Sequence, residues 1–129
     1  MKFLGIDYGA RKVGLAVGDS ESRLAQPLKI IINRNWQQLT TELKVLCDQE
    51  RIELVIIGLP ENPEAKRSAQ LEAVADFAAE LQKHLVIPVI THNERYSTQQ
   101  AQHLVSGGAD DAVAAMITLQ DYLDINHKT

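Results

Sequence analysis

The segment at residues 6–17, IDYGARKVGLAV, largely decides the fold class of this chain. An apolar strand ends in a carboxylate, and a turn glycine and two cations follow directly. Asp7 continues the strand, and alternation puts it on the same face as Phe3 and Gly5. A hydrogen bond that caps the turn would be the ordinary role for such an aspartate. A functional carboxylate at the end of the first strand is the alternative.

Length and composition indicate a single domain over residues 1–129, with 45% hydrophobic and 23% charged residues. No apolar run approaches the roughly 18 residues that cross a bilayer. Cys47 is the one cysteine, so no internal disulfide can form, which favours a reducing cytoplasm. The formal net charge of -4 argues against a general nucleic-acid coat, although it leaves room for a small basic site.

The spacing of apolar residues predicts the order βββαβαβαα. Strands are expected at residues 3–7, 13–18, 28–32, 54–57 and 87–92. The first helix carries Trp36 and Leu46 with Asn33 or Asn35 as its N-cap, and the second opens at residues 62–64. A third is expected at 97–106, and the last runs from Asp110 or Asp111 to about Leu123. Short connections imply that the first three strands are antiparallel, so the prediction is an α/β fold with a mixed five-stranded sheet.

Five short motifs lie along this order, and together they cover nearly the whole chain. They are LGIDYG at 4–9, AQPL at 25–28, GLP at 58–60, NERYST at 93–98, and DAVAA with LQDYL at 111–123. The order resembles the RNase H-like fold, and the motifs resemble the YqgF/RuvX family. Members of that family are called Holliday-junction-resolvase-like proteins and pre-16S ribosomal RNA nucleases.

The resemblance implies three acidic metal ligands, Asp7, Glu94 and Asp111. The family usually has aspartate before the glutamate, and Asn93 takes that place here. Asp110 is suited to the N-cap of the last helix, whereas Asp111 aligns with the family's acid. An exchange of roles between these two neighbours remains open.

Three carboxylates facing a phosphodiester would repel it, so the chemistry calls for divalent cations. Oxygen ligands favour Mg²⁺ or Mn²⁺ over zinc, and His92 has no second histidine or cysteine at zinc-binding spacing. The first and last strands should lie about 10 Å apart with one strand between them. Gly58, at the end of that middle strand, would leave the space between the carboxylates open, although a plain turn would also explain it.

Four residues are candidates for substrate binding: Arg11, Lys12, Arg95 and Thr98. Arg11 and Lys12 could hold backbone phosphates, or they could simply be a solvated hairpin tip. Arg95 lies inside the matching motif, and Ser97 and Thr98 begin a helix whose N-terminus could receive a phosphate.

Two segments depart from the family. Residues 107–110, GGAD, replace a stretch that is usually rich in lysine and arginine, and residues 61–64, ENPE, lack the usual glycine-containing loop. Both changes remove expected contacts with nucleic acid, while the three acidic residues remain.

The prediction is a metal-dependent nuclease with a two-metal mechanism that matures the 5′ end of precursor 16S ribosomal RNA. A Holliday-junction resolvase is the alternative within the same chemistry, so the partner is structured RNA or branched DNA. A family member that binds nucleic acid or protein and cleaves nothing is a further alternative. Sugar kinases and actin-like ATPases also use Asp-x-Gly turns, but they need two such domains. A monomer and a homodimer both fit the sequence.

Overall fold

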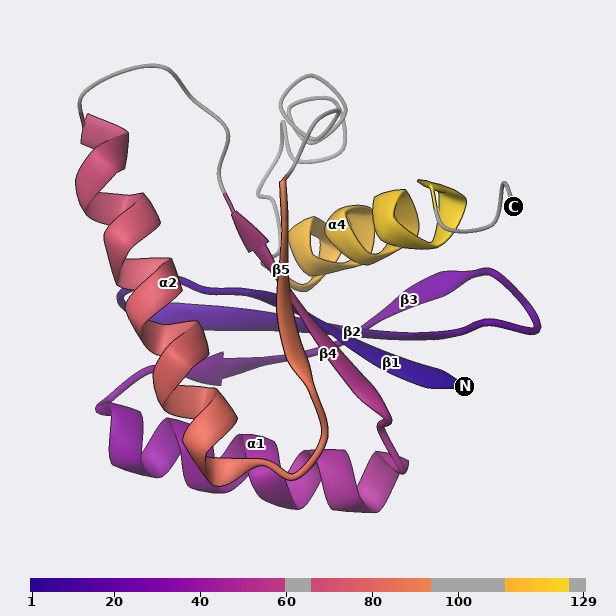
Figure 1. Ribbon diagram of the computed structural model, residues 1–129, viewed down its shortest axis with the longest axis horizontal. Coiled ribbons are helices and arrows are strands. Elements are labelled where there is room, and N and C mark those ends of the chain that lie inside the picture. The colour runs from indigo at the N-terminus through magenta and orange to yellow at the C-terminus, as the bar shows by residue number, and fades with distance from the viewer. Residues whose placement is uncertain (60–65, 94–110, 126–129) are drawn as a thin grey trace.

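A computed structural model of the chain describes residues 1–59, 66–93 and 111–125. The elements in those ranges are β1 (Lys2–Asp7), β2 (Lys12–Asp19), β3 (Ala25–Ile32), α1 (Trp36–Glu50), β4 (Leu54–Leu59), α2 (Lys66–His84), β5 (Val89–Asn93) and α4 (Asp111–Ile125) (Figure 1). The helix expected at 97–106 lies outside the described residues, as does the predicted start of the second helix at 62–64. Among the described helices, none is long and apolar enough to cross a membrane.

The strands form one sheet in the order β3-β2-β1-β4-β5. Short connections make the first three strands antiparallel, whereas β1, β4 and β5 are parallel because helices connect them. The predicted mixed five-stranded sheet is therefore confirmed. Only β4 separates β1 from β5, so the carboxyl ends of these three strands lie together at one end of the sheet.

Helices cover both faces of this sheet, with α1 and α2 on one face and α4 on the other (Figure 1). In β4, which lies between β1 and the edge strand β5, Val55 and Ile57 belong to the core beneath α1 and α2. Leu54 and Ile56 point to the opposite side and belong to the core beneath α4. All four are buried, as the continuous apolar run of this strand predicts.

Three glycines keep the sheet surface beneath α4 bare: Gly5, Gly14 and Gly18. A β-carbon at Gly5 would lie 2.9 Å from the β-carbon of Leu119, and one at Gly18 would lie 3.2 Å from a methyl carbon of Leu123. The alternation of small and large residues along β2 predicts one bare face. The structure shows that α4 packs on this face. Its backbone and side chains lie closer to the sheet than residues larger than glycine at positions 5, 14 and 18 would allow.

Two strands begin two or more residues away from the predicted start. β3 begins at Ala25 instead of residue 28, and it includes Pro27. Proline is tolerated there because β3 is an edge strand and its pairing register shifts nearby, so the missing N–H breaks no regular ladder. β5 begins at Val89, directly after Pro88, instead of residue 87.

Cys47 is a core residue of α1 and is 4% exposed, which confirms its prediction as a small core filler. Burial raises the pKa of its thiol to about 11, with the nearby Asp48 carboxylate adding to the effect. A protonated, buried thiol is a poor nucleophile and a poor metal ligand. Cys47 is therefore part of the packing.

Candidate functional site

Asp7 is the last residue of β1, and the residue after it is anchored on the opposite face. The Tyr8 ring stacks on Phe77 of α2 with centroids 4.5 Å apart, and its hydroxyl accepts a hydrogen bond of 2.7 Å from Trp36 Nε1. Tyr8 packs against the core beneath α1 and α2. Because side chains alternate along a strand, Asp7 faces the α4 side together with Phe3.

The turn after β1 is tied to the start of α1. Asn33 donates from Nδ2 to the carbonyl oxygen of Gly9 over 2.9 Å, and its backbone N–H donates to the carbonyl of Arg11 over 2.8 Å. Asn33 is thus a turn residue, and the N-cap of α1 is Asn35. A β-carbon at Gly9 would overlap the carbonyl oxygen of Lys12, so the turn requires glycine. These contacts hold the segment that follows Asp7 in one place.

Asp111 is the first residue of α4, and it lies against β2. A β-carbon at Gly14 would overlap the carbonyl oxygen of Asp111 and would lie 2.7 Å from the backbone nitrogen of Ala112. Gly14 is also the cross-strand partner of Asp7. Directly opposed residues in an antiparallel pair have α-carbons about 5 Å apart and project to the same face. The backbone of Asp7 and the first turn of α4 therefore converge at Gly14.

A row of three residues continues from Asp7 across the parallel strands. The pairing of Ile6 with Ile57 places Asp7 next to Gly58, and Gly58 pairs with His92. All three members of the row belong to the α4 face, since the core beneath α4 includes their in-phase neighbours. Gly58 contributes no side chain between Asp7 and His92.

His92 is held by α4. Its Nε2 lies 2.7 Å from Oδ2 of Asp121, and the ring meets Tyr122 edge-on at 5.6 Å between centroids. Within the described residues, no group of three or more histidine, cysteine or acidic side chains is placed to hold a metal. The pairing with Asp121 has no sequence signal, because 29 residues separate the two.

The predicted site residues fall into two groups. Asp7 and Asp111 are brought together, and Arg11 and Lys12 lie at an exposed turn. Four others lie outside the described residues, and their roles stay predictions: Glu94, Arg95, Thr98 and Asp110. The residue that sequence reasoning missed is Gly14, although the bare face it belongs to is visible in the sequence.

The two described carboxylates suit a divalent cation. Asp7 and Asp111 supply oxygen ligands of the kind that Mg²⁺ and Mn²⁺ prefer, and their backbones approach the same residue, Gly14. Asp111 is the first residue of α4. The donor set therefore fits such an ion, with a third carboxylate expected from Glu94.

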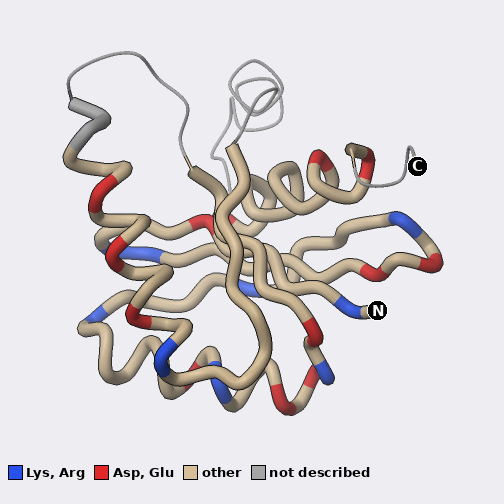
Figure 2. The backbone as a smooth tube through the Cα atoms, viewed as in Figure 1, with Lys and Arg blue, Asp and Glu red and all other residues tan. Residues whose placement is uncertain are grey.

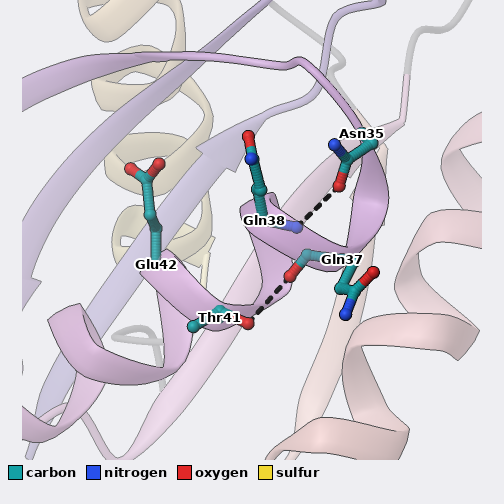
Figure 3. Close-up of a pocket in the computed structure, with 5 residues that line it drawn as sticks. All are labelled: Asn35, Gln37, Gln38, Thr41 and Glu42. Carbon is teal, nitrogen blue, oxygen red and sulfur yellow. Dashed lines mark hydrogen bonds between the residues drawn. The ribbon is translucent and has the colours of Figure 1, made fainter.

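A polar hollow at the start of α1 is a separate feature (Figure 3). Its polar groups bond within the helix, because Asn35 Oδ1 accepts from the Gln38 N–H over 2.8 Å and Thr41 donates to the carbonyl of Gln37 over 2.8 Å. Figure 3 shows both contacts, with Glu42 beside them. These bonds are the normal capping of a helix, so we assign no function to the hollow.

The fold is that of RNase H-like resolvases. RuvC of Thermus thermophilus, solved with a Holliday junction substrate, superposes with a TM-score of 0.60 over 100% of this chain and 97% of its own, at 14% identity. The fowlpox virus resolvase, also solved with Holliday junction DNA, gives a TM-score of 0.60 over 99% of this chain and 100% of its own, at 14% identity. Likeness at this identity establishes the fold alone.

The sequence identifies the family. The family described as "RuvX: Holliday junction resolvase" matches residues 1–125. A protein of Halothermothrix orenii named "Putative pre-16S rRNA nuclease" is 34% identical over 99% of this chain and 98% of its own length. This chain belongs to the RuvX family, and the predicted resemblance is confirmed.

Proposed function

We propose that this chain is a metal-dependent nuclease that hydrolyses phosphodiester bonds during maturation of the 5′ end of precursor 16S ribosomal RNA. The observation that carries the proposal is the convergence of Asp7 with the first turn of α4 at Gly14. Family membership and the names of the curated relatives give the substrate class. The protein would act on structured RNA as a monomer or a homodimer in the cytoplasm.

Asp7 and Asp111 would hold the metal together with Glu94, and Mg²⁺ or Mn²⁺ is the expected ion. A divalent ion at such a site supplies charge neutralisation for the scissile phosphate and activation of a water molecule, and a pair of ions would serve both sides of the bond. The fold of the chain would hold the two aspartates in position. Asp7 is fixed by the strand and by the turn anchored through Tyr8, and Asp111 is fixed by the contact of its helix with Gly14.

The cations near the site would bind the nucleic-acid backbone. Arg11 and Lys12 are exposed at the turn that follows Asp7, and Arg95 and Thr98 are the further predicted contacts. In the described ranges, lysine and arginine are scattered among acidic residues and do not gather on one face (Figure 2). With a net charge of -4, we expect few phosphate contacts, weak binding and only a shallow dependence of the affinity on salt.

Branched DNA is the alternative substrate. The solved neighbours with the same fold were determined with Holliday junctions, and the family description names a Holliday junction resolvase. A protein that binds nucleic acid or a protein partner without cleavage is the other candidate, which the acidic balance favours.

A parallel cleavage assay separates these candidates. The wild-type protein and the Asp7→Asn variant are incubated with a labelled precursor 16S fragment and with a labelled four-way DNA junction, in Mg²⁺, Mn²⁺ or chelator. We expect metal-dependent cleavage of the RNA by the wild type alone. Faster cleavage of the junction would replace the RNA substrate with branched DNA. Binding without cleavage of either substrate in any metal would support the non-catalytic alternative.

A further inference from the structure

Positive charge is unevenly distributed along this acidic chain. Residues 8–18 and 24–41 contain four of the 13 lysines and arginines and none of the 17 aspartates and glutamates. The four cations are Arg11, Lys12, Lys29 and Arg34, and all four are exposed. These two segments are therefore locally basic, and a local excess of positive charge attracts anions even where the whole molecule is acidic.

The two basic segments meet at the end of the sheet where β1 turns into β2 and β3 leads into α1 (Figure 1). Lys12 is the cross-strand partner of Ile32. The next residue, Asn33, donates its backbone N–H to the carbonyl of Arg11 over 2.8 Å, and its side chain bonds to the same turn over 2.9 Å. Arg34 follows Asn33 directly, so its backbone is held beside this turn.

Lys12 lies on the same side of the sheet as the point where the two candidate metal ligands converge. It precedes Gly14 by two residues on β2, and alternation puts both on the α4 face. Two residues of a strand span about 7 Å. Lys12 is therefore about that far from Gly14, where the backbones of the two aspartates meet. A nucleic-acid strand with one phosphate at the aspartates would thus pass close to the cations of this turn.

The cations at this end of the sheet are not used to hold the fold together. No ion pair between described residues involves Arg11, Lys12 or Arg34, whereas Lys2 and Lys83 each pair with a glutamate. α1 begins two residues after Arg34 and has no acidic residue in its first turn. The partial positive charge of that helix start therefore adds to the charge of the cations.

We propose that Arg11, Lys12 and Arg34 form a phosphate-binding patch that holds the nucleic-acid strand where it leaves the candidate site over the turn between β1 and β2. Arg34 adds a third cation to the two that the sequence predicts, and Asn33 fixes its backbone. The proposal rests on the proposed function, because it assumes that a phosphodiester lies at the aspartates. Such a patch recognises backbone charge, which carries no sequence information.

Lys29 provides a matched control on the same strand as the end of the patch. It is exposed and belongs to the same basic segment, but it pairs with Leu15, a residue of the core beneath α1 and α2. Cross-strand partners project to the same face, so Lys29 projects away from the face of the aspartates. Lys44, exposed on α1, is a second control. Replacing either lysine with glutamine removes one positive charge and leaves the patch intact.

The first test is the salt dependence of RNA binding. A fluorescent RNA hairpin with a single-stranded tail is titrated at three salt concentrations in chelator, with a DNA of the same sequence in parallel. Three phosphate contacts predict a log–log slope of about -2 to -3 for the wild type. Arg34→Gln should weaken binding about 5–10-fold near 50 mM salt and reduce the slope by about 0.7–1, on both probes. Lys29→Gln and Lys44→Gln should leave affinity and slope unchanged.

The second test locates the bound strand on the surface. Ile32, opposite Lys12, is 59% exposed, and Val45 on α1 is 50% exposed. The variants Ile32→Cys and Val45→Cys can each carry a thiol-reactive photo-crosslinker, while Cys47 is buried and stays unlabelled. We expect crosslinking to the RNA from position 32 and none from position 45.

Four results would overturn the proposal. They are wild-type affinity and slope in Arg34→Gln, equal losses in Arg34→Gln and Lys29→Gln, equal crosslinking from positions 32 and 45, and a wild type that binds neither probe near 50 mM salt. Cleavage is measured separately in Mn²⁺. A wild type that cleaves RNA while Arg34→Gln binds normally would refute the patch alone. A wild type that cleaves nothing while Arg34→Gln shows the expected loss would refute the nuclease function alone.

Discussion

Gly14 of β2 and Asp111 of α4 lie backbone against backbone, so close that a β-carbon at position 14 would overlap the Asp111 carbonyl oxygen. The same glycine is the cross-strand partner of Asp7. The backbones of two aspartates, more than 100 positions apart in the sequence, therefore meet at one residue without a side chain. The convergence follows from close backbone packing.

Replacing Gly14 with alanine should therefore damage the site more than the fold. The new methyl group must push the first turn of α4 away from β2. Overpacking of this kind lowers the free energy of unfolding by about 1–3 kcal/mol. Asp111 moves with that turn, so we expect cleavage to be nearly abolished. Urea denaturation and a single-turnover cleavage assay measure the two effects separately.

Gly18→Ala is the matched control. A β-carbon at position 18 would have no atom closer than 3.0 Å, and the residues of α4 that it would touch, Leu119 and Leu123, lie far from the first turn of that helix. This variant should keep its activity and stay within about 1 kcal/mol of wild-type stability. Equal losses of activity in both variants would show that α4 moves as a whole and that Gly14 has no special place.

The sequence predicts the parts of this site that depend on neighbouring residues, and it does not predict contacts between residues far apart in the chain. Asp7 is visible because it continues a strand, and Asp111 because it aligns with an acidic residue of the family that the motifs resemble. The bare face of β2 is also visible from alternation. The contact between Gly14 and Asp111 is not, because local pattern does not say which helix covers a bare face or how closely. The same holds for His92 and Asp121, whose pairing depends on the way α4 crosses the sheet.

The hydrogen bond from Trp36 to Tyr8 should stabilise the turn after Asp7. Trp36→Phe removes the indole donor but retains an aromatic ring, so we expect a loss of about 1 kcal/mol. Tyr8→Phe should cost a similar amount, and the double variant should cost less than the sum of the two. Urea unfolding of the four proteins gives the coupling energy. Additive losses would mean that the 2.7 Å contact contributes nothing.

The buried thiol of Cys47 predicts a loss of stability in alkali. Its pKa is raised from 9.0 to about 11 in the folded protein, so the unfolded chain releases this proton first. The contribution of the protonated Cys47 thiol to the free energy of unfolding is fully present below pH 9 and is lost as the pH rises through about 11. Within that window we expect up to about 1.4 kcal/mol of lost stability per pH unit. Urea unfolding of the wild type and of Cys47→Ala across this pH range isolates the effect of the thiol, because the other ionisable groups titrate equally in both proteins. Parallel pH curves would contradict it.

The two neighbouring aspartates at the start of α4 should behave differently. Asp111→Asn should abolish cleavage and leave the fold nearly unchanged. Asp110→Ala should remove the predicted N-cap and cost about 1 kcal/mol, with activity retained. Melting curves and cleavage rates for both variants decide the assignment, and the reverse pattern would exchange the two roles.

The most direct test of a metal site at Asp7 and Asp111 is the melting temperature with and without several millimolar Mn²⁺, a concentration of the order that a weak site requires. Converging carboxylates repel one another until a cation joins them, so Mn²⁺ should raise the melting temperature of the wild type. Asp7→Asn should abolish that rise. The control Asp76→Asn, at an exposed position on α2, should retain the full rise. A rise of wild-type size in Asp7→Asn would contradict the account, because the metal would then bind elsewhere.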